Sequence, residues 1–148
     1  MVALPPEWMP LVGRLQTSLE ALLREPDKVE FVTAVADADR NVYVQFAPVA
    51  DMFADRLRIP RGTLVGNATG EAYLTPAGQM TPVQHDRLIA LGWLADDDGT
   101  QAGGNFWRYW HPPVDPGAIA LVGIGALIDG YGIAAPPELQ IRGADRTF

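Results

Sequence analysis

The stretch NVYVQFAP, residues 41–48, decides the fold of this chain. Its side chains alternate in character, with Val42, Val44 and Phe46 on one side and Tyr43 and Gln45 on the other. This period of two predicts a β-strand with one buried face. The opposite face carries an aromatic ring and an amide where an ordinary solvated strand carries charges. That face therefore needs an explanation of its own.

A second strand precedes this one. The segment KVEFVTAVAD, residues 28–37, is rich in β-branched residues, and ADRN at 38–41 supplies turn residues. Two strands joined by such a turn predict an antiparallel hairpin. Pro48 ends the pairing because proline has no N–H to donate.

Three further strands are expected downstream. The segment TLVGNATGEAYL, residues 63–74, predicts a third strand that Gly66 and Gly70 weaken, as is typical of a β-bulge. Residues 93–113 predict two strands joined by a polar, glycine-rich loop. Between the second and third strands, residues 49–60 are typical of one short helix, which Pro60 ends.

Three longer helices are predicted from apolar spacing and from their start signals. Residues 8–24 repeat apolar side chains at helical spacing. Thr81, Pro82 and Gln84 form a capping box at the start of the next helix. Asp115 caps the last helix, which is apolar nearly all round and which GYG at 130–132 ends.

These elements predict an α+β domain over residues 1–148. We expect an antiparallel sheet of about five strands with helices packed mainly on one face, in the order α-β-β-β-α-β-β-α. No repeat or linker divides the chain. The tail, residues 136–148, is expected to be irregular or to add a short edge piece.

The composition argues against several classes of partner. The chain has 148 residues, a net charge of −7 and scattered basic residues, of which only Arg56, Arg58 and Arg61 form a modest group. Nucleic-acid and anionic-membrane surfaces need clustered Lys and Arg, so neither is expected as a partner. Cysteine is absent, which rules out disulfides and thiolate zinc sites.

We expect no secretory signal and no membrane-spanning helix. MVALPPEWMP at residues 1–10 has no basic region before an apolar run, so it does not resemble a secretory signal. The most apolar segment, residues 118–128, is shorter than the roughly 20 residues that a membrane-spanning helix needs. We expect a soluble cytoplasmic protein.

No residue pattern points to catalysis. His85 and His111 are not spaced as a metal pair, and Ser18 lacks the glycine-flanked elbow of a nucleophile. GNATGEA at 66–72 lacks the lysine of a phosphate-binding loop, and DDDG at 96–99 lacks the spaced ligands of a calcium loop. We therefore expect no enzyme activity, no metal and no cofactor.

The late strand has aromatic rings on both faces. NFWRYWHPP at 105–113 places Phe106, Arg108 and Trp110 on one side and Trp107, Tyr109 and His111 on the other. A sheet that is covered by helices on one side needs only one apolar face. The second face is either a protein-binding surface, since Trp, Tyr and Arg commonly supply binding energy, or it is covered by another layer or by a second copy.

The last helix raises a similar question. A helix that is apolar all round is buried on two sides, in the core or in a subunit interface. If it forms an interface, the candidate residues are Leu121, Ile124, Leu127 and Ile128.

Five segments, taken in order, resemble one known family. They are YVQF at 43–46, NATGEAYL at 67–74, LIALGW at 88–93, GNFWRYW at 104–110 and DPGAIALVGIGALIDGYG at 115–132. In order and spacing they resemble the actinobacterial TY-Chap domains, which are related to YbjN proteins and to the chaperones of type III secretion systems. The resemblance covers residues 29–133. Residues 51–60 look like extra length relative to the family. The family tends to have an acidic residue near Asn67 and an asparagine near Glu71, so the residues at these two positions look exchanged.

The resemblance implies a non-enzymatic, often dimeric domain that holds extended or amphipathic peptide segments. The client segment is expected on an exposed sheet face or in a dimer groove, and the candidate peptide-binding residues are Tyr43, Gln45, Trp107 and Tyr109. The expected partners are a protein or peptide client and a second copy of the chain. The alternative is a self-associating structural or regulatory module without a peptide ligand, in which the aromatic residues fill the interface.

Overall fold

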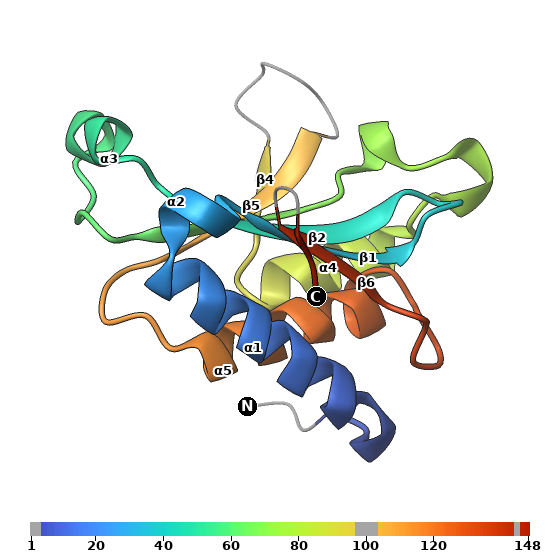
Figure 1. Cartoon of the computed structure of the whole chain (residues 1–148). Helices are drawn as coiled ribbons and strands as arrows, with labels where there is room; N and C mark the ends of the chain where they lie inside the picture. Colours follow the sequence, from blue (N-terminus) through green and yellow to red (C-terminus); the bar gives the residue numbers. More distant parts are fainter. Residues whose placement is uncertain (1–3, 97–103, 144–145) are drawn as a thin grey trace.

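The protein is a mixed α+β domain built on one open antiparallel sheet (Figure 1). A computed structural model describes residues 4–96, 104–143 and 146–148. The strands are β1 (Val32–Asp37), β2 (Val42–Pro48), β3 (Leu64–Ala68), β4 (Leu94–Asp96), β5 (Gly104–Trp110), β6 (Gln140–Gly143) and β7 (Arg146–Thr147). Their order across the sheet is β4-β5-β3-β2-β1-β6-β7. The predicted α+β class is confirmed.

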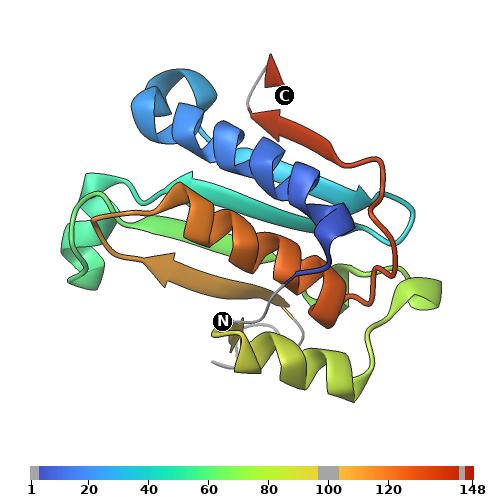
Figure 2. The ribbon, with the colours of Figure 1, turned by 90° about the horizontal axis from the view of Figure 1, so that it is seen from below.

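Helices α1 (Met9–Arg24) and α5 (Pro116–Gly125) cover one side of this sheet. The other helices are α2 (Pro26–Val29), α3 (Asp51–Leu57) and α4 (Pro82–Ala90), with the short 3-10 turns η1 (Pro6–Trp8), η2 (Glu71–Tyr73) and η3 (Pro76–Gly78) and the π-helical segment η4 (Ala126–Gly130) after α5. Figure 2 shows α1 and α5 lying side by side beneath the strands, with α4 beyond β5. No helix in the described part of the chain is long and apolar enough to cross a membrane.

The predicted hairpin is present, and its register fixes which face is core. Val32 pairs with Phe46, and Ala34 pairs with Val44. All four side chains are fully buried against the helices. The helix-facing side of the sheet is therefore the apolar side of NVYVQFAP, as its alternation predicts.

Gly123 brings α5 close to the sheet. A Cβ at this position would lie 3.0 Å from Phe46 Cζ and 3.3 Å from Leu15 Cδ2. The absence of a side chain at Gly123 therefore lets α5, α1 and β2 meet at one point of the core.

The start signals of α4 and α5 are confirmed. Thr81 Oγ1 accepts a hydrogen bond from Gln84 N at 3.2 Å, and Gln84 Oε1 accepts one from Thr81 N at 2.9 Å. Asp115 Oδ1 accepts from the backbone N–H groups of residues 117 and 118. These bonds satisfy N–H groups that a helix start leaves without an intrahelical partner.

The structure differs from the expected elements at the start of β1 and the end of β3. The expected first strand, residues 28–37, begins only at Val32, because Pro26 starts the short helix α2 and Glu30 has a φ of 64°. The expected third strand, residues 63–74, stops at Ala68. Beyond it, Thr69 N still donates to Tyr43 O at 3.2 Å, but Tyr43 N donates to Thr69 Oγ1 at 2.9 Å, so a side-chain oxygen takes the place of one backbone acceptor.

Residues 136–148 are not irregular throughout, because they add β6 and β7 to the sheet. Ile141 pairs with Ala34 and is fully buried. Arg14 on α1 donates to Leu139 O at 3.1 Å, which fixes the approach to β6. β6 and β7 thus extend the expected sheet of about five strands beyond β1.

Candidate functional site

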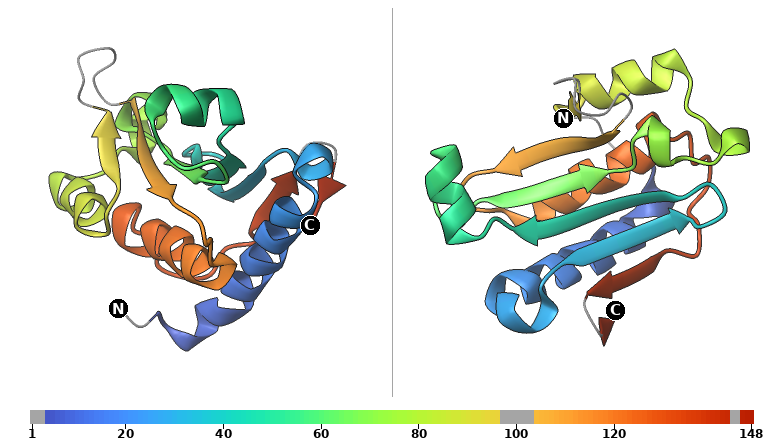
Figure 3. Two further views of the ribbon diagram at one scale, coloured as in Figure 1. Left: turned by 90° about the vertical axis from the view of Figure 1, so that its left-hand side faces the viewer. Right: turned by 90° about the horizontal axis from the view of Figure 1, so that it is seen from above.

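Among the described residues, no helix lies over the side of the sheet away from α1 and α5. Figure 3 (right) shows the strands of this side in front of the helices, with α3 at one end. We call it the open face and define it by the side chains that alternate with the core: Thr33, Val35, Tyr43, Gln45, Val65, Asn67, Trp107 and Tyr109. The four candidate peptide-binding residues all lie on it.

A continuous row of side chains crosses the open face. Paired positions link the row in the order Arg142, Thr33, Gln45, Asn67, Trp107 and Leu94, from β6 to β4. Directly paired residues have Cβ atoms about 5 Å apart, so each side chain of the row can touch the next. Along the row the side chains change in character. The row begins with a cationic and a hydroxyl side chain, continues with two amides, and ends with an aromatic ring and an aliphatic side chain.

The aromatic end of this row is accessible. Trp107 and Tyr109 are each 37% exposed, and Leu94 beside Trp107 is also exposed. Val65 pairs with Tyr109 and extends the apolar surface onto β3. Exposed rings on neighbouring positions of one strand form a contact surface of the kind that supplies binding energy between proteins.

Tyr43 is held in place by a neighbour that the sequence analysis did not include in the site. Asn105 Nδ2 donates to Tyr43 Oη at 3.3 Å, and Asn105 Oδ1 accepts from Gly70 N at 2.9 Å. Asn105 therefore connects the Tyr43 ring to the loop after β3. Only the register of β3 and β5 brings these residues together, so no local pattern indicates the bond.

Asn67, at the middle of the row, has an unsatisfied acceptor. Its Oδ1 is buried and has no hydrogen-bond donor among the described residues. Leaving a buried acceptor unpaired costs about 1–3 kcal/mol. The neighbours across the sheet are Gln45 and Trp107, so this acceptor lies between the amide and the ring of the predicted site.

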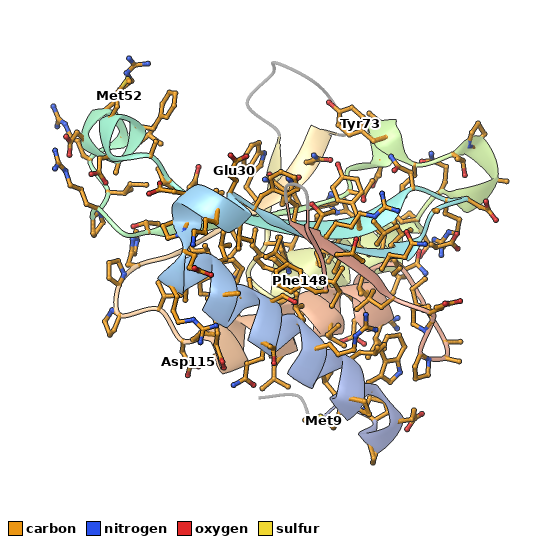
Figure 4. All side chains as sticks on the ribbon, viewed as in Figure 1. Met9, Glu30, Met52, Tyr73, Asp115 and Phe148 are labelled. Atoms are coloured by element: carbon orange, nitrogen blue, oxygen red, sulfur yellow. The ribbon has the colours of Figure 1, made fainter. Side chains whose placement is uncertain are left out.

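Helix α3 places further apolar side chains at the end of the strands. Met52 is 65% exposed, and Phe53 and Leu57 are also exposed (Figure 4). Only Ala54 of this helix is buried. The short helix was predicted, but its apolar residues point to solvent, because α3 stands beyond the sheet with little to pack against (Figure 1).

Two ion pairs join α3 to Arg61 in the segment that follows it. Arg61 Nη2 lies 2.7 Å from Asp55 Oδ2, and its Nη1 lies 3.8 Å from Asp51 Oδ2. The hydrogen bond from Arg61 lowers the pKa of Asp55. Arg56 stacks over the Phe53 ring at 5.6 Å, so a cation accompanies the exposed ring.

The four candidate interface residues of the last helix divide into two groups. Ile124 and Leu127 are fully buried within one chain, so their side chains are not accessible to a second copy. Leu121 and Ile128 are partly exposed. The physical reason is that α5 already packs on two sides, against α1 and against the sheet, which accounts for much of its all-round apolar pattern.

The histidines and the serine have structural partners. His85 meets the Phe106 ring edge-on at 5.3 Å, and His111 Nδ1 lies 3.3 Å from Thr63 Oγ1. Ser18 Oγ donates to Arg14 O at 2.9 Å within α1. In the described part of the chain, no three His, Asp or Glu residues gather as a metal site. Residues 97–99 of the DDDG segment lie outside the described residues.

Comparison with known proteins identifies the family. A family model named TY-Chap3, described as "T3SS (YopN, CesT) and YbjN peptide-binding chaperone 3", matches residues 2–145. The chain belongs to the TY-Chap3 family. Comparisons with curated proteins and with solved structures gave no match.

Membership of TY-Chap3 confirms the resemblance predicted from five short segments. The match extends past the predicted range of 29–133 to residues 2–145. It therefore takes in α1 and β6 as parts of the family domain. The family's description makes this a peptide-binding chaperone domain, in agreement with the coarse function predicted from the sequence.

Proposed function

We propose that this TY-Chap3 domain holds an extended segment of a client protein on its open face. The observation that carries the proposal is the row Gln45, Asn67 and Trp107, which no helix in the part of the chain that the structure describes covers. The Gln45 amide in the row can pair with a peptide backbone, while the rings of Trp107 and Tyr109 take apolar side chains. The family description supports a peptide as the ligand.

Strand geometry favours one direction for the client. Side chains on the same face of an extended peptide repeat about every 6.6–6.8 Å, whereas neighbouring strands lie about 4.8 Å apart. A segment running along β5 matches this repeat, because Trp107 and Tyr109 are two residues apart on the same face. We therefore place two successive same-side residues of the client against these two rings.

The sheet edges contribute less than the face. β4 has three residues and β7 has two, so each edge offers few backbone groups to an added strand. Side-chain contact on the open face therefore supplies most of the affinity in this proposal, and strand addition at an edge has a minor role.

The test uses Trp107→Ala and Tyr109→Ala. The probe is a permanently unfolded, carboxymethylated model protein, together with a peptide array in which apolar and polar residues alternate. We expect each variant to bind at least tenfold more weakly, because truncation of a buried aromatic anchor commonly costs about 2 kcal/mol or more.

The matched control is Leu23→Ala on α1. Leu23 is also 37% exposed but lies on the helical side of the molecule, so its truncation should leave binding unchanged. Circular dichroism and thermal unfolding verify the fold of all variants. If the two ring variants stay folded and bind as tightly as the native chain, the open face is not the client site.

Self-association is the second candidate role, and the partly exposed Leu121 on α5 favours it. We propose that a homodimer would use this side chain together with Ile128. Light scattering on Leu121→Glu is the test, and a monomer that keeps the native circular dichroism spectrum is the expected result. A native chain that is already monomeric at high concentration would contradict the dimer.

A further inference from the structure

A second concave site lies on the helical side of the molecule, away from the open face. A hollow of about 400 Å³ is bounded by α5, by the end of α4 and by Leu4. Its walls include Leu91, Leu121 and Val122, and its charged members are Arg108 and Asp129. We call it the α4–α5 hollow. Its volume falls in the range of small-molecule sites.

Arg108 has an unusual position in this hollow. Its side chain lies on the helix-facing side of β5 together with Phe106, which belongs to the core, and Trp110, which packs against the core. One N–H group donates to Leu91 O, and the guanidinium lies 5.2 Å from the Trp110 ring centre. No carboxylate of the described residues forms an ion pair with it.

A half-buried guanidinium without a carboxylate has unused binding capacity. Arginine carries several N–H donors in a fixed fork that matches a carboxylate. Burial removes water from around the guanidinium and thereby lowers the pKa of Arg108. An anion that entered the hollow would offset this loss of hydration and would form a charge-assisted hydrogen bond.

We propose that the α4–α5 hollow binds an apolar group that ends in a carboxylate, with the carboxylate on Arg108 and the hydrocarbon against Leu121 and Leu4. The apolar walls provide the hydrophobic contact. Asp129 repels an anion placed on its own side of the hollow, so it directs the acid end toward Arg108. Two sources share this chemistry: a free alkanoic acid, and the C-terminal residue of a peptide.

The test is calorimetric titration with octanoate, decanoate and 1-octanol. We expect octanoate to bind at least tenfold more tightly than the alcohol of the same length, because a hydrogen bond to a charged group contributes about 1.5–3 kcal/mol. Decanoate should bind more tightly than octanoate, by roughly fourfold per added methylene while the hollow has room. Equal binding of acid and alcohol, or no binding of either, would overturn the proposal.

Two substitutions separate a charge effect from a structural one. Arg108→Gln keeps a donor for Leu91 O but removes the cation, so it should abolish the preference for octanoate and leave the affinity for octanol unchanged. Asp129→Asn should strengthen octanoate binding severalfold. The control is Arg24→Gln in the last turn of α1, an exposed arginine outside both the hollow and the open face, which should change neither affinity. An octanoate preference that survives Arg108→Gln contradicts the assignment.

A peptide arm distinguishes the two sources. The probes are acetyl-Ala-Leu-Leu as the free acid and as the amide. If the free acid binds with octanoate-like affinity and the amide does not, peptide C-termini are ligands of the hollow. If only octanoate binds, the ligand is a small acid. Both results support the carboxylate site, whereas tighter binding of the amide than of the acid counts against it. Neither result depends on the open face.

Discussion

The hydroxyl of Tyr131 joins two parts of the molecule that are distant in sequence. It donates to Thr69 O at 2.5 Å, so it ties the end of η4 to the loop after β3. The side chain is buried, and burial raises its pKa well above the usual tyrosine value. Tyr43 raises this pKa further, while Arg40 acts in the opposite direction. The same bond thus fixes the loop that carries Gly70, the donor to Asn105.

The raised pKa of Tyr131 predicts a loss of stability in alkali. Above pH of about 10 the unfolded chain releases the phenolic proton and the folded chain keeps it, so the free energy of unfolding falls as the pH rises. Tyr131→Phe should cost about 1 kcal/mol at neutral pH through the lost hydrogen bond. It should then lose less stability than the native chain between pH 9 and 11, by urea unfolding.

Tyr109→Phe is the control for this pH series. Tyr109 is partly exposed on the open face, so its substitution should preserve the alkaline loss of the native chain. Parallel pH curves for Tyr131→Phe and the native chain would show that the ionisation of Tyr131 does not govern the loss.

Residue chemistry indicated the side chains of the candidate site but not their geometry. The alternation in NVYVQFAP separates Tyr43 and Gln45 from the core residues, and the rings of the late strand indicate a contact surface. Sequence cannot show which side of β5 the helices cover, because both sides carry aromatic residues. The burial of Arg108 and the unpaired Oδ1 of Asn67 likewise depend on how β5, β3 and β2 pair, which local sequence does not determine.

Gly13 in α1 and Gly123 in α5 differ in the space that surrounds them. Gly13 lies within α1 with no atom within 4 Å of an added Cβ, whereas a Cβ on Gly123 would press on Phe46 and Leu15. Gly13→Ala should therefore raise the free energy of unfolding by about 0.5–1 kcal/mol through helix propensity. Gly123→Ala should lower it by about 1 kcal/mol, because the strain of overpacking exceeds that gain.

Urea unfolding of both variants and the native chain measures this difference. Both substitutions are the same chemical change inside a helix, so each is the control for the other. Equal stabilisation by the two would mean that Phe46 and Leu15 move aside freely, and the close approach of α5 would then have no energetic consequence.

At the scale of elements, local signals predicted the helices better than the sheet. The capping residues Thr81 and Asp115 act within three positions of sequence, so their effect can be predicted without a fold. β6 and β7 have only a few residues each, and they are strands because β1 offers a free edge beside α1. Such pairing depends on residues more than a hundred positions away.

The charge of the whole molecule predicts how clients approach. A net charge of −7 attracts basic segments at long range. We expect the association rate of an alternating Leu–Lys peptide to fall severalfold as salt rises from 0.02 to about 0.5 M, because the Debye length shrinks from about 20 Å to a few ångströms. Stopped-flow fluorescence measures the rate. An alternating Leu–Glu peptide is the control and should show the opposite trend, while rates that do not respond to salt would exclude electrostatic steering.

The last residues of the chain shield β1 from its surroundings. β6 pairs with β1, and Phe148 N donates to Ile141 O at 2.9 Å, which keeps the terminal segment on the sheet (Figure 4). A shortened protein that stops at residue 135 would present β1 as a bare template for strand addition, and we expect it to form insoluble polymers. Affinity handles for purification accordingly belong at the amino end, where they leave this protective strand undisturbed.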